Sequence, residues 1–330
     1  MTLGRTNLLP VDSLARGSLS WDRLRLDPAT EARLVPSTSR VWLAPRAVSA
    51  TPVVDARTGQ AEKYLFYRGV GNLDAPLIVR QQAGTLEVSL REGDKHFKKL
   101  PRLWLVDVAS DGHVRLSTRD AKGRMAEFTN LPERRPGDAS SLAQLQGELR
   151  AALTAEGLYP DEADAMLETW RLSYFESEGL RLFFTLPRAW IDAWLPLEIS
   201  VPSDITRVMV GRIELVSPTQ RALMTELASL PGEAFPPQRL YYQDPAVLAI
   251  SRAGARSHAD LYRATERAVP RALELYESLG RFRDALLAHE SKTAGGGVKV
   301  ANLDRALREF GACVGALAGP ATEAVLTTKQ

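Results

Sequence analysis

The sequence contains few of the residues from which disulfides and metal sites are built. Only one of its 330 residues is a cysteine, Cys313. A single thiol excludes an intrachain disulfide and any zinc site that needs several cysteines. The four histidines, at positions 96, 113, 258 and 289, show no paired spacing and no HExxH sequence. We therefore expect neither a metal nor a cofactor.

A strong net charge and a long hydrophobic run are also lacking. The 42 basic and 40 acidic residues leave a net charge of +2, which is too small to indicate a nucleic-acid partner. No stretch reaches the roughly 18 to 20 apolar residues of a membrane-spanning helix, and the N-terminus has no apolar run typical of a signal peptide. As written, the chain is expected to be cytoplasmic and without a membrane-spanning segment.

The residues that are present indicate an ordinary globular protein of the α+β class. Hydrophobic residues make up 45% and charged residues 25% of the chain, which is typical of folded domains. We expect four segments: a β-rich domain at 1–135, a helical hairpin with strands that could complete the sheet at 138–216, a helical region at 217–290, and a flexible joint with a C-terminal helix or tail at 291–330.

The N-terminal half shows the alternation of apolar and polar residues that is typical of strands. TLEVSL, residues 85–90, is the clearest case. Three hairpin turns are expected at Ala83-Gly84, Asp111-Gly112 and Lys122-Gly123, because glycine supplies the positive φ that such turns favour. The pattern predicts an antiparallel β-sandwich or a barrel-like domain.

Helical spacing begins near residue 141 and predicts a helical hairpin. Strands are expected again in GLRLFFTL, LEISV and ITRVMVGRIELV, with a short amphipathic helix, PRAWIDAWLP, between the first two. Further helices are predicted to begin at Ser217-Pro218 and Asp244-Pro245, where a capping residue precedes proline at the first helical position.

The stretch EKYLFYRGVGNLDAPLIV contains the Gly69-Val70-Gly71 turn, which has two interpretations. A dinucleotide-binding loop needs a third glycine and a helix directly after it, whose N-terminus receives the phosphates. The residues that follow, from Asn72 to Arg80, have the pattern of a strand instead. The turn is therefore predicted to be a corner between two strands and not a nucleotide site.

No sequence motif predicts a catalytic residue. The chain has no Gly-x-Ser-x-Gly, and Cys313 lies in GACVGALAG without polar neighbours, which is typical of a buried structural thiol. Acidic pairs such as Glu176 and Glu178 are as well explained as solvated surface. A hydrolase whose site is assembled from distant segments stays open as an alternative.

Two groups of residues are candidate binding surfaces. Aromatic residues are dense between Trp170 and Trp194, and most are explained by a hydrophobic core. Trp190 and Trp194, four residues apart on the short helix that carries Arg188 and Asp192, could belong to this core as well, or they could face outward as a ligand or partner surface.

The second group is a set of arginines in the C-terminal half, at spacings that place them on one helical face. They are Arg256, Arg263, Arg267 and Arg271. This face could bind a polyanion, or it could be an ordinary solvated surface, because Glu266 and Glu274 lie among the arginines.

The segment EKYLFYRGVG and the block from Gly157 to Pro218 together resemble a family of uncharacterised bacterial proteins. The resemblance covers about a third of the chain, and the Tyr-Arg-Gly, Thr-Trp, Pro-Arg and Val-Gly-Arg elements occur in the family's order. It implies no activity and no catalytic residue. Members tend to begin with an export signal and additional sequence, so this chain is either truncated or mis-started, or a cytoplasmic relative.

These observations together predict a non-enzymatic interaction or structural protein. Its partner would be another protein or a second copy of the chain, and nucleic acid is not expected. A place in the cell envelope is expected if the native chain has an upstream signal. The alternatives are a hydrolase-type enzyme and a polyanion-binding protein that uses the arginine face.

Overall fold

A computed structural model describes most of the chain. The described residues are 5–7, 18–36, 40–67, 75–82, 85–109, 111–120, 123–129, 140–235, 258–280, 282–293 and 298–311. The chain divides into two compact units, residues 1–215 and residues 216–330. The four segments predicted from the sequence stay a prediction.

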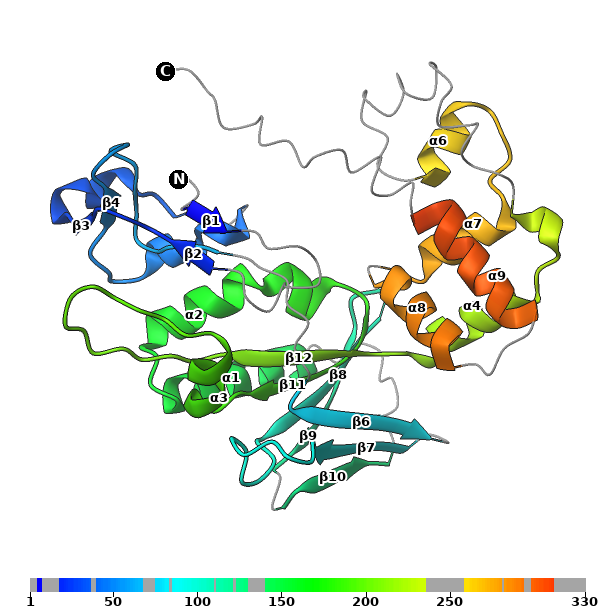
Figure 1. The fold of residues 1–330 in the computed structure, drawn as a ribbon, viewed down its shortest axis with the longest axis horizontal. Helices are drawn as coiled ribbons and strands as arrows, with labels where there is room; N and C mark the ends of the chain where they lie inside the picture. The colour runs from blue at the N-terminus through cyan, green and yellow to red at the C-terminus, as the bar shows by residue number, and fades with distance from the viewer. Residues whose placement is uncertain are drawn as a thin grey trace. The chain divides into compact units, whose positions relative to one another are not determined.

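The first unit begins with short strands (Figure 1). β1 (Arg5–Asn7) pairs antiparallel with β2 (Ser18–Ser20). β4 (Val53–Asp55) lies between β3 (Leu24–Leu26) and β5 (Ala61–Glu62), and both pairings are antiparallel. None of these strands exceeds three residues, so each pairing contributes only a few backbone hydrogen bonds.

Two 3-10 helices accompany these strands, η2 (Pro28–Arg33) and η3 (Val41–Ala47). η3 packs against α2 (Pro160–Thr169), which lies more than a hundred residues further along the chain. The backbone N–H of Ser49 donates to Oδ2 of Asp161 at 2.8 Å. This bond fastens the N-terminal segment to the first turn of α2, where a carboxylate also suits the positive end of the helix dipole.

A three-stranded antiparallel sheet follows, with the order β10-β7-β6. β6 (Leu77–Gln82) and β7 (Thr85–Leu90) form the hairpin expected from the sequence, and its turn lies outside the described residues. β10 (Met125–Phe128) pairs with the other edge of β7. The Gly69-Val70-Gly71 corner also lies outside the described residues, but the strand expected after it is confirmed as β6.

A four-stranded antiparallel sheet has the order β12-β11-β8-β9. Its strands are β8 (Leu103–Val108), β9 (Val114–Arg119), β11 (Gly179–Thr185) and β12 (Val210–Leu215). The β8–β9 hairpin expected at Asp111-Gly112 is confirmed, and Gly112 has a φ of 81°. That left-handed conformation is the one for which this turn needs glycine.

The third expected hairpin, at Lys122-Gly123, is wrong. β9 pairs with β8, whereas β10 pairs with β7 in the other sheet, so β9 and β10 do not pair with each other. The reason is burial: Phe128 of β10 is 1% exposed and belongs to the apolar cluster of the β6–β7 sheet. The free energy gained by burying Phe128 favours pairing of β10 with β7 over pairing with β9.

One hydrophobic cluster joins the two sheets. It contains Val88 of β7, Leu103 and Leu105 of β8, and Leu182 and Phe184 of β11. The residues of β8 and β11 occur at every second position of their strands, so they point to the same face of the four-stranded sheet, and Val88 packs against them from the other sheet. This cluster is the scaffold on which the candidate site described below is built.

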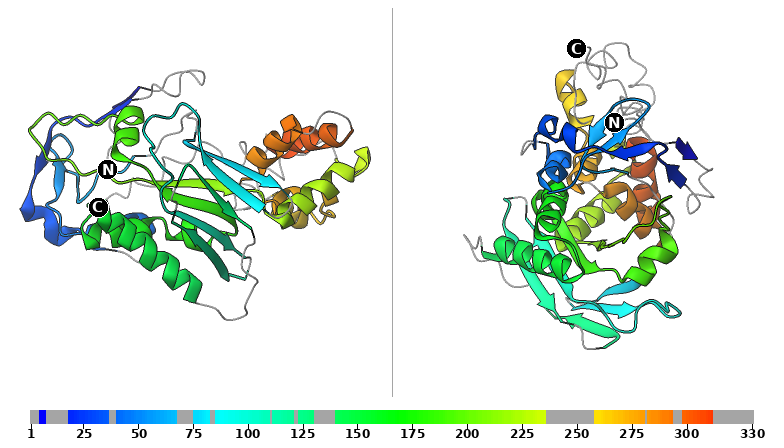
Figure 2. Two further views of the ribbon diagram at one scale, coloured as in Figure 1. Left: turned by 90° about the horizontal axis from the view of Figure 1, so that it is seen from below. Right: turned by 90° about the vertical axis from the view of Figure 1, so that its left-hand side faces the viewer.

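Helices cover the opposite face of the four-stranded sheet (Figures 1 and 2). Leu145, Leu149 and Leu153 of α1 (Ser140–Ala155) are fully buried against Trp104 and other side chains that point away from the first cluster. Their four-residue spacing places them on one side of the helix. Because β8 is packed on both faces, all six of its residues are buried.

The second unit is helical among its described residues. It contains α4 (Pro218–Ser229), η5 (Gly232–Ala234), α6 (His258–Ala264), α7 (Arg271–Ser278), α8 (Arg283–Thr293), α9 (Val298–Ala306) and the π-helical turn η6 (Leu307–Gly311). The helix start expected at Ser217-Pro218 is confirmed, with a capping box between Ser217 and Gln220. Tyr276 and Phe310 pack with 5.3 Å between ring centroids in the core.

The α+β class predicted from the sequence is confirmed by these helices and antiparallel sheets. None of the sheets formed by the described residues closes into a barrel. The second predicted start, at Asp244-Pro245, lies outside the part of the chain that the structure describes.

Candidate functional site

The short helix expected from PRAWIDAWLP is present as α3 (Arg188–Trp194). Pro187 precedes it in an extended conformation, and the helix is held by two residues that point inward, Trp190 and Ile191. Trp190 is 5% exposed and packs in the cluster that joins the two sheets. Burying this large ring fixes the position of α3 on the scaffold.

The interpretation in which both tryptophans face outward is therefore wrong for Trp190. Trp194 lies one turn further along α3 and is 47% exposed. The ring centroids of the two residues are 6.2 Å apart. The ring of Trp194 therefore lies beside the buried ring of Trp190, and its other side is exposed to solvent.

Arg188 and Asp192 form part of a clamp, which we define as Arg188, Asp192 and Arg207. Arg188 Nε donates to Asp192 Oδ2 at 2.7 Å, and a terminal nitrogen of Arg207 donates to Oδ1 of the same carboxylate at 2.9 Å. Arg188 also donates to the backbone carbonyl of Ile205. The hydrogen bond from Arg188 holds the pKa of the Asp192 carboxyl below its ordinary value.

The clamp joins the two ends of the segment between α3 and β12, residues 195–209, which we call the α3–β12 loop. Arg188 and Asp192 lie on α3 before the loop, whereas Ile205 and Arg207 lie near its end. Thr206, near the end of the loop, lies close to Gly157, which stands between α1 and α2: a Cβ at position 157 would be 3.1 Å from Cγ2 of Thr206.

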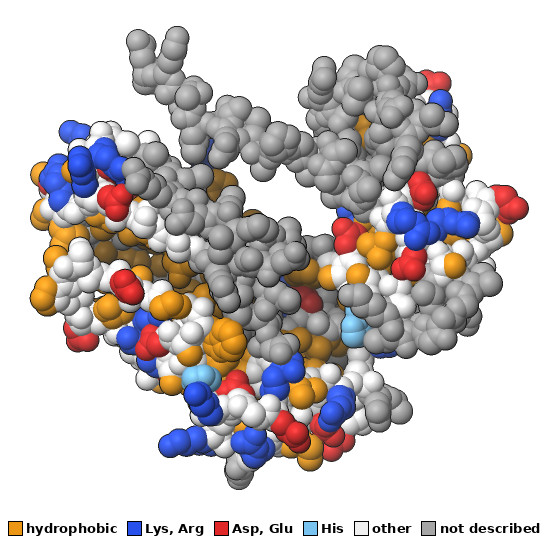
Figure 3. Space-filling model, viewed as in Figure 1, with side chains coloured by type: hydrophobic (Ala, Val, Ile, Leu, Met, Phe, Trp, Pro, Cys, Tyr) orange, Lys and Arg blue, Asp and Glu red, His pale blue; other side chains and the backbone are white. Residues whose placement is uncertain are grey.

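The loop exposes a row of aliphatic side chains. Leu197 is 49%, Ile199 is 48% and Val201 is 61% exposed, and they follow directly on Trp194. We call these four residues the apolar row. Figure 3 shows hydrophobic atoms at the left-hand edge of the view, where Figure 1 draws the loop, and along a hollow between the loop and the segment that contains β3 and β4.

The strand predicted for LEISV, residues 197–201, is wrong. These residues have no regular secondary structure, and the chain bends at Ser200 and Val201. Pro196 and Pro202 stand on either side of the segment and have no N–H to donate to a neighbouring strand. The alternation that would bury one face of a strand instead leaves Leu197, Ile199 and Val201 in solvent.

Some of the charged side chains around the apolar row form ion pairs, and others do not. Both arginines of the clamp bind Asp192, so their charge is partly neutralised. Glu198 and Asp204 are exposed, and neither forms an ion pair with a residue that the structure describes. The loop between the two ends of the clamp therefore presents two carboxylates that no described residue pairs.

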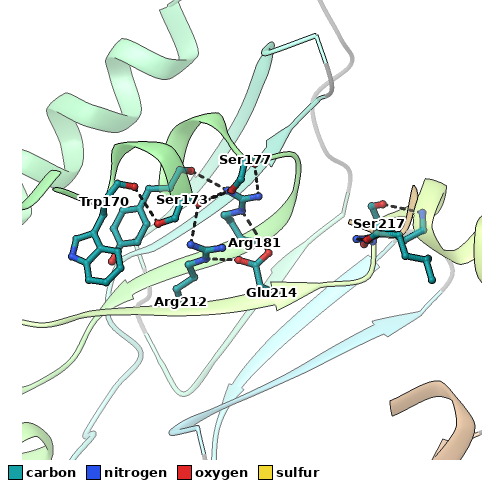
Figure 4. A network of polar contacts seen from close by, with 10 residues as sticks. Trp170, Ser173, Ser177, Arg181, Arg212, Glu214 and Ser217 are labelled. Atoms are coloured by element: carbon teal, nitrogen blue, oxygen red, sulfur yellow. Dashed lines mark hydrogen bonds and ion pairs between the residues drawn. The ribbon is translucent and has the colours of Figure 1, made fainter. Parts of the chain in front are cut away.

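A buried arginine, which the sequence reasoning missed, lies on the helical side of the four-stranded sheet (Figure 4). Arg181 of β11 is fully buried. It donates to the carbonyls of Ser173 at 2.9 Å, Tyr174 at 3.2 Å and Ser177 at 2.6 Å. These carbonyls belong to the end of the π-helical turn η4 (Leu172–Glu176), whose oxygens otherwise lack donors.

Arg212 and Glu214 of β12 complete this network. Arg212 donates to the carbonyl of Ser173 at 2.9 Å and to the carboxylate of Glu214, which also lies 3.7 Å from Nε of Arg181. The carboxylate balances part of the charge of two guanidinium groups in a mostly buried place. We assign the network a structural role, because its donors are aimed at the backbone of η4.

The four arginines expected on one helical face are not brought together on one. Arg256 lies outside the described residues. Arg263 is on α6, Arg267 follows that helix, and Arg271 is the first residue of α7. The helix breaks because Glu266 has a φ of 57° and Pro270 precedes α7 in an extended conformation.

Two of these arginines are also occupied by carboxylates. Arg263 pairs with Asp260 at 2.8 Å, and Arg271 pairs with Glu226 at 2.7 Å and with Glu274 at 3.1 Å. The hydrogen bond that Arg271 donates to Glu226 raises the pKa of Arg271 above its ordinary value. A polyanion would have to displace these partners, so the arrangement favours the solvated-surface interpretation.

A small pocket lies among the short N-terminal strands. This pocket, beside β3, β4 and β5 and lined by Trp21, Leu24 and Leu65 among others, has a volume of about 20 Å³, enough for about one water. Within the described residues, no group of three His, Cys, Asp or Glu side chains is arranged to hold a metal. No described helix is both long and apolar enough to cross a membrane.

Comparisons of the chain with protein-family models, with curated proteins and with solved structures found no match. The resemblance noted in the sequence therefore stays a prediction, and the function of the protein is inferred from the candidate site.

Proposed function

We propose that the chain is a non-enzymatic interaction protein, and that the apolar row on the α3–β12 loop binds a protein partner. The exposed fractions of Leu197, Ile199 and Val201 carry this proposal. Single exposed aliphatic residues are common on protein surfaces and need no explanation. Three exposed aliphatic residues in one short loop, next to an exposed tryptophan, are more than the single exposed residues of an ordinary surface, and such exposed apolar groups mark interaction sites.

The way the loop is held supports the same function. Trp190 anchors α3 in the core, and the clamp joins both ends of the loop. Restricting the loop before binding lowers the conformational entropy that a partner must remove. A loop without a binding role would not need a buried anchor such as Trp190 and a clamp between its two ends.

A protein partner is favoured over a lipid surface by the charges on the loop. Membrane-binding segments usually combine apolar side chains with unpaired Lys or Arg, which contact anionic headgroups. Here Arg188 and Arg207 are bound to Asp192, and the unpaired charges at the rim are the carboxylates of Glu198 and Asp204.

We further propose that the two sheets form the β-sandwich expected from the sequence, as a rigid support for the loop. The shared cluster that contains Val88, Leu105 and Leu182 supports this arrangement. A second copy of the chain as the partner, a place in the cell envelope and the hydrolase alternative stay predictions from the sequence.

A test of the function compares the wild-type chain with a loop variant in which Leu197, Ile199 and Val201 are all replaced by serine. A library of short random peptides is selected on the wild-type chain, and each enriched peptide is then measured against both proteins. We expect enriched peptides to lose at least about thirtyfold in affinity on the loop variant, as removal of a hot spot does.

The control variant carries Met125→Ser and Leu172→Ser, two exposed apolar residues of the same unit that lie outside the loop. It should bind the peptides as the wild-type chain does. Peptides that bind all three proteins equally would contradict the proposal. Sedimentation of the chain with phosphatidylcholine or phosphatidylglycerol vesicles, lost in the loop variant, would show that the row serves a lipid surface instead.

A further inference from the structure

Three exposed carboxylates lie in and beside the α3–β12 loop. Glu198 lies between Leu197 and Ile199, and Asp204 lies shortly after the apolar row. Glu156 precedes Gly157, the residue that approaches Thr206 at the end of the loop. None of the three carboxylates forms an ion pair with a described residue.

The cations of the same region are already bound. Arg188 and Arg207 share the carboxylate of Asp192, and Arg188 also donates to the carbonyl of Ile205. Two guanidinium groups share one carboxylate, so the clamp keeps a positive charge, and Glu198 and Asp204 are the charged side chains of the loop that no described residue pairs. A partner that packs on the apolar row therefore meets these two carboxylates within the loop. Complementary charge on a partner would be attracted to these carboxylates, and like charge would be repelled.

From this pattern we infer the chemistry of the partner: a polypeptide segment with apolar side chains flanked by lysine or arginine. The inference rests on the proposed function, since it assigns a partner to the same apolar row. The apolar side chains of the segment would pack on Trp194, Leu197, Ile199 and Val201, and its basic side chains would face Glu198 and Asp204. The apolar contacts supply most of the affinity, and the charges decide which segment is accepted.

The experiment uses three fluorescent synthetic peptides with the same spacing of leucines. One has lysine between the leucines, one has glutamate and one has serine. Their binding to the full chain is measured by fluorescence anisotropy at low and high salt. The proteins are the wild-type chain, the loop variant, and a charge variant with Glu198→Gln and Asp204→Asn, which leaves every apolar side chain in place.

We expect the lysine peptide to bind most tightly to the wild-type chain and the glutamate peptide least. The charge variant should weaken the lysine peptide by about two- to tenfold, as expected for rim charges, and should remove most of the salt dependence. The loop variant should abolish the binding of all three peptides. Circular dichroism checks that each variant is folded.

The outcomes separate this inference from the proposed function. If the lysine and glutamate peptides bind equally and only the loop variant removes binding, the inference is wrong and the proposed function stands. If the loop variant binds every peptide as the wild-type chain does, both are wrong. Failure of the lysine peptide to bind the wild-type chain would also overturn the inference.

Discussion

At the scale of single residues, Arg181 shows how one buried charge positions a piece of backbone. Its guanidinium donates to three carbonyls at the end of η4 while the carboxylate of Glu214 lies nearby. Charged groups buried in this way are costly unless they are paired and fully hydrogen-bonded. The network therefore fixes η4 on the four-stranded sheet, because the carbonyls need hydrogen-bond donors and the buried guanidinium needs acceptors.

Replacing this side chain should destabilise the first unit strongly. Arg181→Met keeps most of the side-chain volume but leaves the carbonyls of Ser173, Tyr174 and Ser177 with fewer donors. We expect the free energy of unfolding to fall by about 3 kcal/mol, measured by urea denaturation followed by tryptophan fluorescence.

The matched control is Arg150→Met, which breaks the exposed ion pair with Asp164. An exposed pair contributes little, so this variant should unfold near the wild-type midpoint. Equal midpoints for the Arg181 and Arg150 variants would show that the network does not hold η4.

Tyr174 of η4 gives a pH-dependent test of the same region. Burial raises the pKa of its phenol to about 12, above the ordinary value near 10. The favourable effect of the neutral phenol is fully present below pH 10 and is lost as the pH rises from about 10 to about 12. Burial also raises the pKa of Tyr276, so ultraviolet titration should show more than one late-ionising tyrosine, and the one with a midpoint near 12 should be missing in Tyr174→Phe. A difference curve with its midpoint near 10 would contradict the burial of this ring.

Single residues were the hardest part of the site to predict from sequence. Spacing alone could not distinguish Trp190 from Trp194, because a four-residue interval places both on one side of a helix but does not say how far that side is covered. Arg181 was missed although its neighbours Leu180 and Leu182 fix the alternation of β11. The alternation predicts on which face of β11 Arg181 lies. It does not predict that helices bury this face.

At the scale of elements, the α3–β12 loop depends on the clamp. Asp192 is the shared member, since it accepts from both Arg188 and Arg207. Because the folded pKa of Asp192 is lowered, the clamp is complete at neutral pH. Its contribution is lost as the pH falls below the ordinary aspartate value and through the lowered one.

Removing the charge of Asp192 should release the end of the loop without unfolding the unit. In the wild-type chain the side chain of Arg207 is only 12% exposed, which limits cleavage by trypsin after this residue. Asp192→Asn should accelerate that cleavage, followed by mass spectrometry, while the urea midpoint stays close to that of the wild type.

Asp164→Asn is the control, because it disturbs an ion pair with Arg150 that does not involve the loop. It should leave cleavage after Arg207 unchanged. Similar acceleration in both variants would mean that the clamp does not hold the loop.

Helices and strands were predicted well where the local sequence pattern agreed with the neighbouring elements that they pair with or pack against. The alternation of TLEVSL predicted β7, and the cap at Ser217 predicted the start of α4. LEISV has the same alternation but forms no strand, since strands need a pairing partner that local sequence does not reveal. The arginine spacing failed for a similar reason, because Pro270 ends the helical repeat before Arg271.

At the scale of the whole molecule, the two units have separate cores that different probes report. All six tryptophans lie within residues 1–215. Tryptophan fluorescence therefore follows the first unit, whereas far-ultraviolet circular dichroism also follows the helices of the second. Leu273 of α7 is fully buried in the core of the second unit, and Leu149 of α1 is fully buried in the first.

We expect Leu273→Ala to destabilise the second unit by about 3 kcal/mol. The change should appear in the circular dichroism transition and leave the fluorescence transition in place. Leu149→Ala should shift the fluorescence transition by a comparable amount. A fluorescence shift caused by Leu273→Ala would show that the two units unfold together.

The sequence predicted the α+β class of the molecule but not the neighbours of every strand. Periodicity is a local property, so it distinguishes strands from helices. Which sheet receives β10 depends on the burial of Phe128 among residues that are distant in sequence. The candidate site combines both kinds of information: the short helix was predictable, and the unpaired apolar row after it was visible only in three dimensions.

The central claim, that the α3–β12 loop contacts a protein partner, is tested most directly by photo-crosslinking in cells of the source organism. A photoreactive phenylalanine derivative replaces Ile199 in one version of the chain and Leu172, exposed to a similar degree, in another. We predict a discrete crosslinked protein from position 199 that is absent from position 172. No crosslinked protein from position 199, or the same products from both positions, would contradict the account.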